Sequence, residues 1–261
     1  MLDAPTRVVV VRFPHWASFA AALGRAARTA FEPIVQSVVE HVPLVEVTAP
    51  GVIVFATRGP SRYVGGDDRL AALVQSTVSG ATHAAFGVGI ADGRLAAGIA
   101  ARHAIQSGEP LVVPPEASAR WLATSSVRAL IECVEVIGAV KGAAGAGVPG
   151  ADDIASYRDV VSLLERLGLY RFGDVAALSE ADLIARFGAF GRDLSRLSRG
   201  LDRHPPLVVA PPPDRVCTLQ FDTPVESRDA VVAASNDLAV GLVDHLAANG
   251  LAMVRLHVLI D

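Results

Sequence analysis

Apolar positions along the first third of the chain recur with two different periods, and the changes between them outline a mixed fold. Residues 8–13 form a short β-branched run typical of a buried strand, and residues 17–42 are rich in alanine with bulky apolar residues at helical spacing. Two apolar runs at 45–48 and 52–57 then flank the turn Ala49-Pro50-Gly51. This pattern predicts a strand, a helix and a hairpin.

The following segments extend this alternation of strands and helices. Residues 66–80 carry two carboxylates in the first turn and a glycine near the end, as helices prefer. Residues 82–91 are predicted to form a strand and residues 94–104 a helix. The order β-α-β-β-α-β is that of a ferredoxin-like split βαβ unit, so we predict the α+β class, with a sheet that carries its helices on one face.

The rest of the chain has a different organisation. Gly/Ala-rich residues 141–150 predict a loop, residues 157–202 predict short helices, and Pro-rich residues 204–213 predict a semi-rigid linker. A strand at 217–221, a helix at 229–249 and a strand from 253 follow. Because that last strand stops at residue 261, we expect the final domain to be truncated.

Composition and charge narrow the class of protein. Hydrophobic residues make up 51% and charged residues 19%, which favours a folded chain, and the net charge of −4 means that any DNA contact must be a local patch. Cys133 and Cys217 show no metal-binding or disulfide spacing. No leader and no apolar stretch of about 18 uncharged residues is apparent, so we expect a cytoplasmic protein with no membrane contact.

The sequence RFGAFGRDLSRLSRG at 186–200 is the strongest positive sign of a binding site. Gly188 and Gly191 form an FGxxG turn that opens a helix, where backbone N–H groups can approach a phosphate. The arginines close to it are Arg186, Arg192, Arg196 and Arg199. These features predict a helix-hairpin-helix contact with DNA, and a plain helix–helix turn with solvated arginines is an equally good interpretation.

Other candidate sites have simpler interpretations. The seven histidines lack metal-binding spacing, and the pairs Asp67-Asp68 and Asp152-Asp153 fit helix N-termini. The glycines of residues 86–94 match neither a P-loop nor a Rossmann fingerprint, so we predict a structural role for them. We therefore expect neither a metal site nor a cofactor.

Taken together, four phrases in the chain resemble the Y-family (translesion) DNA polymerases. The hairpin at 45–59 is similar to the family's YSIDEAFLD, and FGVGIADGRLAAGIAARHA to GIAxNKxLAKIAS. LERLGLYRFGDVAAL is similar to LxxLGIxTxGDLA, and RFGAFGRDLSRLSRGLD to xFGxxGxxLxxLxxGID. The resemblance covers nearly the whole chain. It implies a palm at 1–130, a helical thumb at 131–203, a linker at 204–215 and the start of a little-finger domain at 216–261.

The departures from the family pattern concern its catalytic residues. Arg12 and Pro14 stand where the family's first strand supplies aspartates, and Pro50 and Gly51 replace the Asp-Glu pair of the hairpin. Two-metal phosphoryl transfer needs carboxylate oxygens to hold Mg²⁺, whereas an arginine repels it. We therefore expect a pseudo-polymerase and not an enzyme.

Further departures affect the fingers, the thumb and the nucleotide contact. Residues 17–30 leave room only for reduced or missing fingers. The GIGxK phrase of the thumb's first hairpin is absent, and GADDIASYRD at 150–159 lies near its place. Arg94 falls where the family has a lysine that contacts the incoming nucleotide's phosphates. Its alternative interpretation is a solvent-exposed arginine at a helix start.

The vacated sites, together with RFPHW at 12–16 and TRGPSRYVGG at 57–66, resemble the ImuB branch of the family. That branch implies a non-catalytic adaptor in the SOS response to DNA damage. The full-length protein would bridge the sliding clamp, a RecA-like accessory protein and an error-prone polymerase, with weak binding of primer-template DNA through the thumb.

Two alternatives remain open from the sequence. An active error-prone polymerase would need replacement carboxylates, and Asp92 stands at a suitable strand end. An unrelated α+β protein with a coincidental helix-hairpin-helix is the other alternative.

Overall fold

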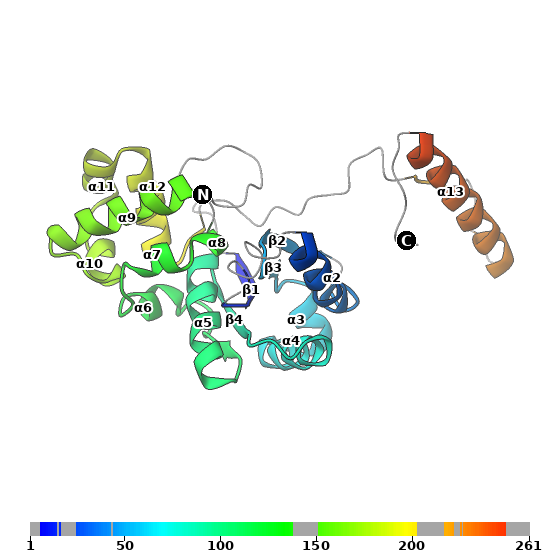
Figure 1. The fold of residues 1–261 in the computed structure, drawn as a ribbon, viewed down its shortest axis with the longest axis horizontal. Helices are drawn as coiled ribbons and strands as arrows, with labels where there is room; N and C mark the ends of the chain where they lie inside the picture. The colour runs from blue at the N-terminus through cyan, green and yellow to red at the C-terminus, as the bar shows by residue number, and fades with distance from the viewer. Residues whose placement is uncertain are drawn as a thin grey trace. The chain divides into compact units, whose positions relative to one another are not determined.

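The computed structural model describes residues 6–14, 16, 25–42, 44–137, 151–202, 217–221, 225 and 227–248. The chain divides into two compact units, Met1–Val208 and Val209–Asp261 (Figure 1). The predicted loop at 141–150 and the predicted linker at 204–215 lie outside the described residues, as does most of the segment 17–30, where reduced or missing fingers were predicted.

A mixed sheet of five strands forms the centre of the first unit. The strands follow the order β2-β3-β1-β4-β5 and span Arg7–Arg12 (β1), Glu46–Ala49 (β2), Val52–Ala56 (β3), Gly87–Asp92 (β4) and Leu111–Val112 (β5). β1 pairs antiparallel with both β3 and β4, and β4 pairs parallel with β5. The α+β prediction is confirmed at the level of a mixed sheet with helices.

Both faces of the sheet are covered, which differs from the prediction of helices on one face. Helices α2 (Arg25–Val39) and α4 (Asp67–Ala81) pack with Val9 and Val11 of β1 in one apolar cluster. Helix α5 (Arg94–Ser107) packs with Val8 and Val10 in a second cluster, and the two groups of helices lie on opposite sides of β1 in Figure 1. The uninterrupted valine run is typical of a strand buried on two faces.

The glycines of β4 let α5 approach the sheet through its backbone. A Cβ atom on Gly87 would lie 2.1 Å from the carbonyl oxygen of Ala101, and one on Gly89 would lie 2.3 Å from that of Ala97. No side chain fits in this space. The structural role predicted for these glycines is therefore confirmed.

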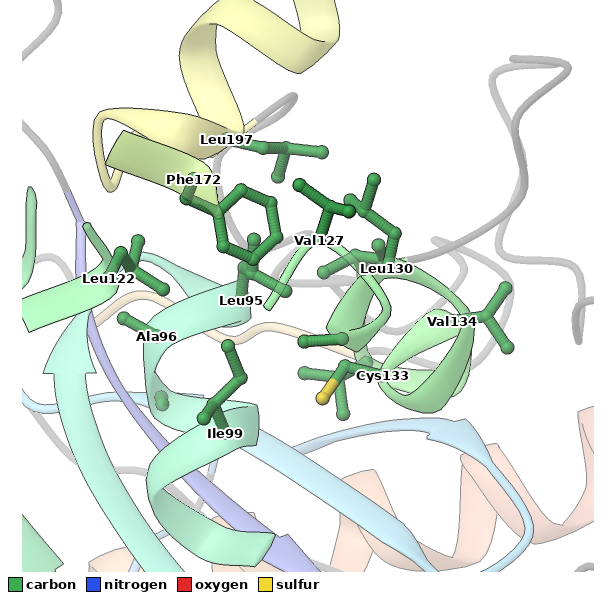
Figure 2. Packing of buried hydrophobic residues seen from close by; sticks show 14 of the residues in the cluster. Leu95, Ala96, Ile99, Leu122, Val127, Leu130, Cys133, Val134, Phe172 and Leu197 are labelled. Atoms are coloured by element: carbon green, nitrogen blue, oxygen red, sulfur yellow. The ribbon is translucent and has the colours of Figure 1, made fainter. Parts of the chain in front are cut away.

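The other described helices of the first unit are short, as predicted for residues 157–202, except the one at Ala151–Arg166, which has 16 residues. They span Pro60–Val64 (α3), Ser118–Leu122 (α6), Ala129–Glu132 (α7), Val134–Ile137 (α8), Ala151–Arg166 (α9), Phe172–Ala176 (α10), Glu180–Phe187 (α11) and Ala189–Ser198 (α12). Figure 2 shows Phe172 and Leu197 among Leu95, Leu122 and Val127. The helices after the sheet therefore share one core with α5.

Element boundaries differ from the predictions in two places. The helices predicted at 66–80 and 94–104 are confirmed as α4 and α5, whereas β4 begins at Gly87, five residues later than predicted. The strand predicted at 217–221 is wrong, because these residues adopt no regular structure. The strand predicted from residue 253 lies outside the described residues.

The described part of the second unit contains helix α13, Arg228–Ala248, where a helix was predicted. By length and composition alone, α13 is apolar enough to cross a membrane over Arg228–Ala247. Asp237 and Asp244 interrupt this stretch. Asp237 lies at the centre of the stretch, where an aspartate in a membrane-spanning helix costs about 3 kcal/mol, so the composition is weak evidence for insertion.

Candidate functional site

The four residues predicted to stand in place of catalytic carboxylates, Arg12, Pro14, Pro50 and Gly51, meet at one end of the sheet. Arg12, the last residue of β1, pairs with Val52 at the start of β3. The backbone N–H of Phe13 donates to the carbonyl oxygen of Gly51 at 2.9 Å. Arg12 and Pro14 therefore lie beside the Pro50-Gly51 turn.

Trp16 fills the space next to this turn. Gly51 has φ +88°, and a Cβ atom at this position would lie 2.2 Å from Cβ of Trp16 and 2.8 Å from its Cγ. The Trp16 ring is buried with Phe13 and Phe31, at centroid distances of 5.4 and 5.1 Å. A carboxylate-bearing side chain at position 51 does not fit this arrangement.

The Arg12 side chain turns towards the helices that follow the sheet. Its Nη2 lies 3.5 Å from Oε2 of Glu135, and its Nη1 lies 4.0 Å from Sγ of Cys133. Burial raises the pKa of the Cys133 thiol to about 11, so it stays protonated at neutral pH. The described residues hold no group of three or more His, Cys, Asp or Glu side chains that could bind a metal ion.

Arg94 is held by carboxylates within the chain. Its two Nη atoms donate to both carboxylate oxygens of Glu46 at 3.2 and 2.6 Å. Its side chain is only 12% exposed, so the interpretation as a solvent-exposed arginine is wrong. A bidentate pair with low exposure leaves Arg94 a poor contact for an external phosphate unless Glu46 moves.

Asp202 lies at the N-terminus of α5, and sequence reasoning missed it. Its Oδ1 accepts a hydrogen bond of 2.6 Å from the Arg94 backbone N–H, while its Oδ2 is buried without a partner in the described structure. Burial raises the pKa of this carboxyl to about 6, although Arg94 and Arg196 act in the opposite direction. The chain therefore supplies its own anion at this helix end.

Asp92, the suggested replacement carboxylate, lies at the opposite end of β1. It pairs with Arg7 in the sheet, five residues before Arg12, which is roughly 16 Å along a strand. Its Oδ1 accepts from Arg7 Nη1 at 3.1 Å, and its Oδ2 accepts from the Glu116 backbone N–H at 2.6 Å. The prediction that Asp92 stands at a suitable strand end is wrong, because the antiparallel register carries it away from the turn.

The predicted helix-hairpin-helix consists of α11 and α12, joined at Gly188. Gly188 has φ +60°, and no heavy atom lies within 4 Å of a Cβ built there. Gly191 is different, since its Cβ would lie 2.1 Å from the carbonyl oxygen of Leu183. Gly191 therefore brings the two helices into close contact, whereas Gly188 shapes an exposed turn.

The four arginines of this segment divide into two pairs. Arg186 is exposed, and Arg192 is 68% exposed with only a 3.5 Å ion pair to Glu180. Arg196 Nε donates to the Asp202 carbonyl oxygen at 2.9 Å, and Arg199 donates to the carbonyl oxygens of Ala176 and Leu178 at 2.9 and 3.0 Å. Arg186 and Arg192 are thus accessible to a phosphate, while Arg196 and Arg199 stabilise backbone carbonyls.

The arrangement favours binding of anions over binding of metal ions. An arginine and a glycine turn packed on Trp16 lie at the sheet end, and the exposed Arg186 and Arg192 lie beside the Gly188 turn. The function has to be argued from these residues, since a comparison of the chain with models of known protein families gives no match.

Proposed function

We propose that this chain is a catalytically inactive Y-family DNA polymerase homologue of the ImuB type. It acts as an adaptor in damage-induced translesion synthesis and mutagenesis, without a cofactor of its own. The observation that carries the proposal is the sheet end at Arg12 and Gly51. Four residues that cannot ligate Mg²⁺ meet there, and Trp16 closes the space that a side chain at position 51 would need.

The topology of the first unit supports a polymerase-like palm. The strand order β2-β3-β1-β4, with β1 antiparallel to both neighbours, is the order of a split βαβ unit. Helices α2 and α4 pack together on one face, as the two helices of such a unit do. On this interpretation, α9 to α12 correspond to the thumb and α13 to the little finger.

The exposed turn at Gly188 supports weak binding of the DNA backbone. Arg186 and Arg192 are the two arginines of the segment that face solvent, so they would neutralise about two phosphates. The logarithm of affinity for duplex DNA should then fall with the logarithm of salt with a slope of about −2. The adaptor's further partners in the full-length protein are the sliding clamp, a RecA-like protein and an error-prone polymerase, in the cytoplasm.

An active polymerase is the enzyme alternative. It would require carboxylates near Arg12, but the suggested Asp92 is bound to Arg7 at the other end of β1. No described group of acidic side chains suits a metal ion. The alternative therefore has no structural observation in its favour.

A primer-extension assay with Mg²⁺ and with Mn²⁺, beside a fluorescence-anisotropy titration of primer-template DNA at two salt concentrations, tests the proposal. We expect no extension, and salt-sensitive binding that Arg186→Gln with Arg192→Gln weakens at least several-fold. Arg158→Gln, which changes an exposed arginine on α9, is the matched control and should bind like the parent chain. Extension by purified protein would contradict the inactive palm, and binding indifferent to the double variant would contradict the contact at the Gly188 turn.

A further inference from the structure

The segment 57–69, which runs from the end of β3 through α3 into the first turn of α4, carries an exposed set of basic and aromatic side chains. Tyr63 is 91% exposed, an extreme value for an aromatic residue, and Arg58, Arg62 and Arg69 are exposed beside it in sequence. Within the described part of the chain, these three arginines form no ion pair. By contrast Arg7, Arg12 and Arg94 are all paired with carboxylates.

The backbone that carries these side chains is fixed to the sheet. Asp67 accepts from Arg7 Nε at 2.5 Å and also accepts from the Ser61 hydroxyl. The Ser61 backbone N–H donates to the Thr57 carbonyl oxygen at 2.9 Å, and the Gly65 N–H donates to that of Ser61 at 3.0 Å. A segment fixed in this way loses little conformational entropy when a ligand binds.

Glycines leave the space between these basic and aromatic side chains free of other side chains. Gly59 and Gly66 have φ values of +104° and +126°, and nothing lies within 4 Å of a Cβ built on either residue. At Gly65, a Cβ atom would lie 2.8 Å from Nη1 of Arg69, so this guanidinium lies over the glycine. Arg69 is therefore brought back to the C-terminal end of α3, the helix that carries Tyr63.

The segment 57–69 carries a net positive charge, although the whole chain carries a net negative charge. It holds three arginines and two aspartates, and the adjacent Arg7 pairs with both Asp67 and Asp92, so four arginines stand against three carboxylates. The local charge balance is thus +1 in a chain of net charge −4. A local patch of this kind attracts anions that the molecule as a whole repels.

We infer that the segment 57–69 binds single-stranded nucleic acid. A base stacks on the exposed ring of Tyr63, and neighbouring phosphates contact Arg58, Arg62 and Arg69. Single strands offer unpaired base faces together with phosphates, which is the combination that exposed aromatic and basic side chains recognise. An acidic peptide would use the arginines and leave the ring without a partner, so it fits the surface less well.

This surface is distinct from the duplex contact proposed at the Gly188 turn and does not rest on it. A failure of the duplex contact can be distinguished from a failure of the single-strand contact, because each involves different arginines and a different DNA ligand. Loss of duplex binding in the Arg186→Gln, Arg192→Gln variant leaves the prediction for single strands unchanged.

The test measures the affinity of the chain for a labelled oligothymidine and for an abasic strand of equal length, about 15 nucleotides each. We expect Tyr63→Ala to weaken oligothymidine binding about tenfold and to leave the abasic strand unaffected, because only bases stack. Arg58→Gln, Arg62→Gln and Arg69→Gln together should reduce the salt slope by about 2 on both strands. Arg158→Gln is again the matched control.

Four outcomes would overturn the inference. One is an equal loss on both strands in Tyr63→Ala, and another is no loss on either. The third combines two results: polyglutamate competes for the chain as well as the abasic strand does, and Tyr63→Ala leaves oligothymidine binding unchanged. These results would identify an acidic peptide as the partner. Photocrosslinking with 4-thiothymidine should label the peptide that contains Tyr63, and labelling confined to other peptides would also contradict the site.

Discussion

The two ends of β1 each carry an arginine of low exposure, but only one of these arginines is fully bound. Arg7 donates to Asp67 at 2.5 Å, to Asp92 at 3.1 Å and to the Val113 carbonyl oxygen at 2.7 Å. Arg12 has a 3.5 Å ion pair with Glu135, and its Nε is buried without a partner in the described structure. The side chains are 15% and 13% exposed, so burial does not distinguish them.

This difference shows which end of the strand stabilises the fold. The Arg7 end joins β1 to β4, to the start of α4 and to the segment after β5 through charged hydrogen bonds. The Arg12 end is closed by aromatic packing and a glycine turn, with a cation that has few contacts. A buried charge with full partners is costly to remove, whereas one with poor partners contributes little.

The largest expected effect comes from removing the well-bound arginine. Arg7→Met leaves Asp67 and Asp92 without their cation, so the free energy of unfolding should fall by about 3–5 kcal/mol. Arg12→Met is the matched control at the other strand end, and it should change stability by less than about 1 kcal/mol. Urea denaturation followed by circular dichroism measures both values. Equal losses would show that the two ends do not differ as their contacts indicate.

A smaller effect is expected at the Gly51 turn. Gly51→Ala combines a positive φ with a clash against Trp16, and it should lower the free energy of unfolding by about 3 kcal/mol. Gly59→Ala is matched in φ and has open space around it, so it should cost only about 1 kcal/mol. In the same denaturation assay, the difference between the losses in Gly51→Ala and Gly59→Ala measures the cost of the clash with Trp16. Similar losses for both variants would mean that Trp16 moves aside readily.

The smallest effect concerns Asp202, which lies near Asp92 at the Arg7 end. Burial raises its pKa to about 6 in the folded chain, against about 4 in the unfolded chain, so the folded state holds the extra proton. The contribution of Asp202 to the free energy of unfolding is therefore greatest below about pH 4 and is lost as the pH rises through about 6. Asp202→Asn cannot titrate, so the stability of the parent relative to this variant should fall across that window. A difference that stays flat with pH would refute the raised pKa.

Sequence reasoning located the elements that depend on local pattern. The valine run, the hairpin and helices α4 and α5 follow from periodicity and turn residues, because these signals lie within one segment. Which end of β1 Asp92 lies beside depends on the strand pairing, and the residues close to Asp92 in the sequence do not encode that pairing. The unbroken run Val8 to Val11 is itself a sign of a strand buried on both faces, which the order of a split βαβ unit does not predict.

The candidate site was harder to predict because its contacts join distant residues. Arg94 binds Glu46 across 48 positions, and its backbone N–H meets Asp202 across 108 positions. The arginines of 186–200 looked equivalent in sequence, and only helix packing separates the exposed Arg186 and Arg192 from the structural Arg196 and Arg199. Asp202 was visible only as the last letter of a phrase that resembled the family.

The burial of Trp16 against Gly51 also gives the molecule an internal optical probe. The chain has two tryptophans, and the other, Trp121, is half-buried with its ring 6.1 Å from that of His103. Trp16 is enclosed by Phe13 and Phe31, an environment that shifts indole emission to shorter wavelength than water does. In a chain carrying Trp121→Phe, all tryptophan fluorescence comes from Trp16. The wavelength of its emission maximum then reports whether Trp16 is packed against the Gly51 turn.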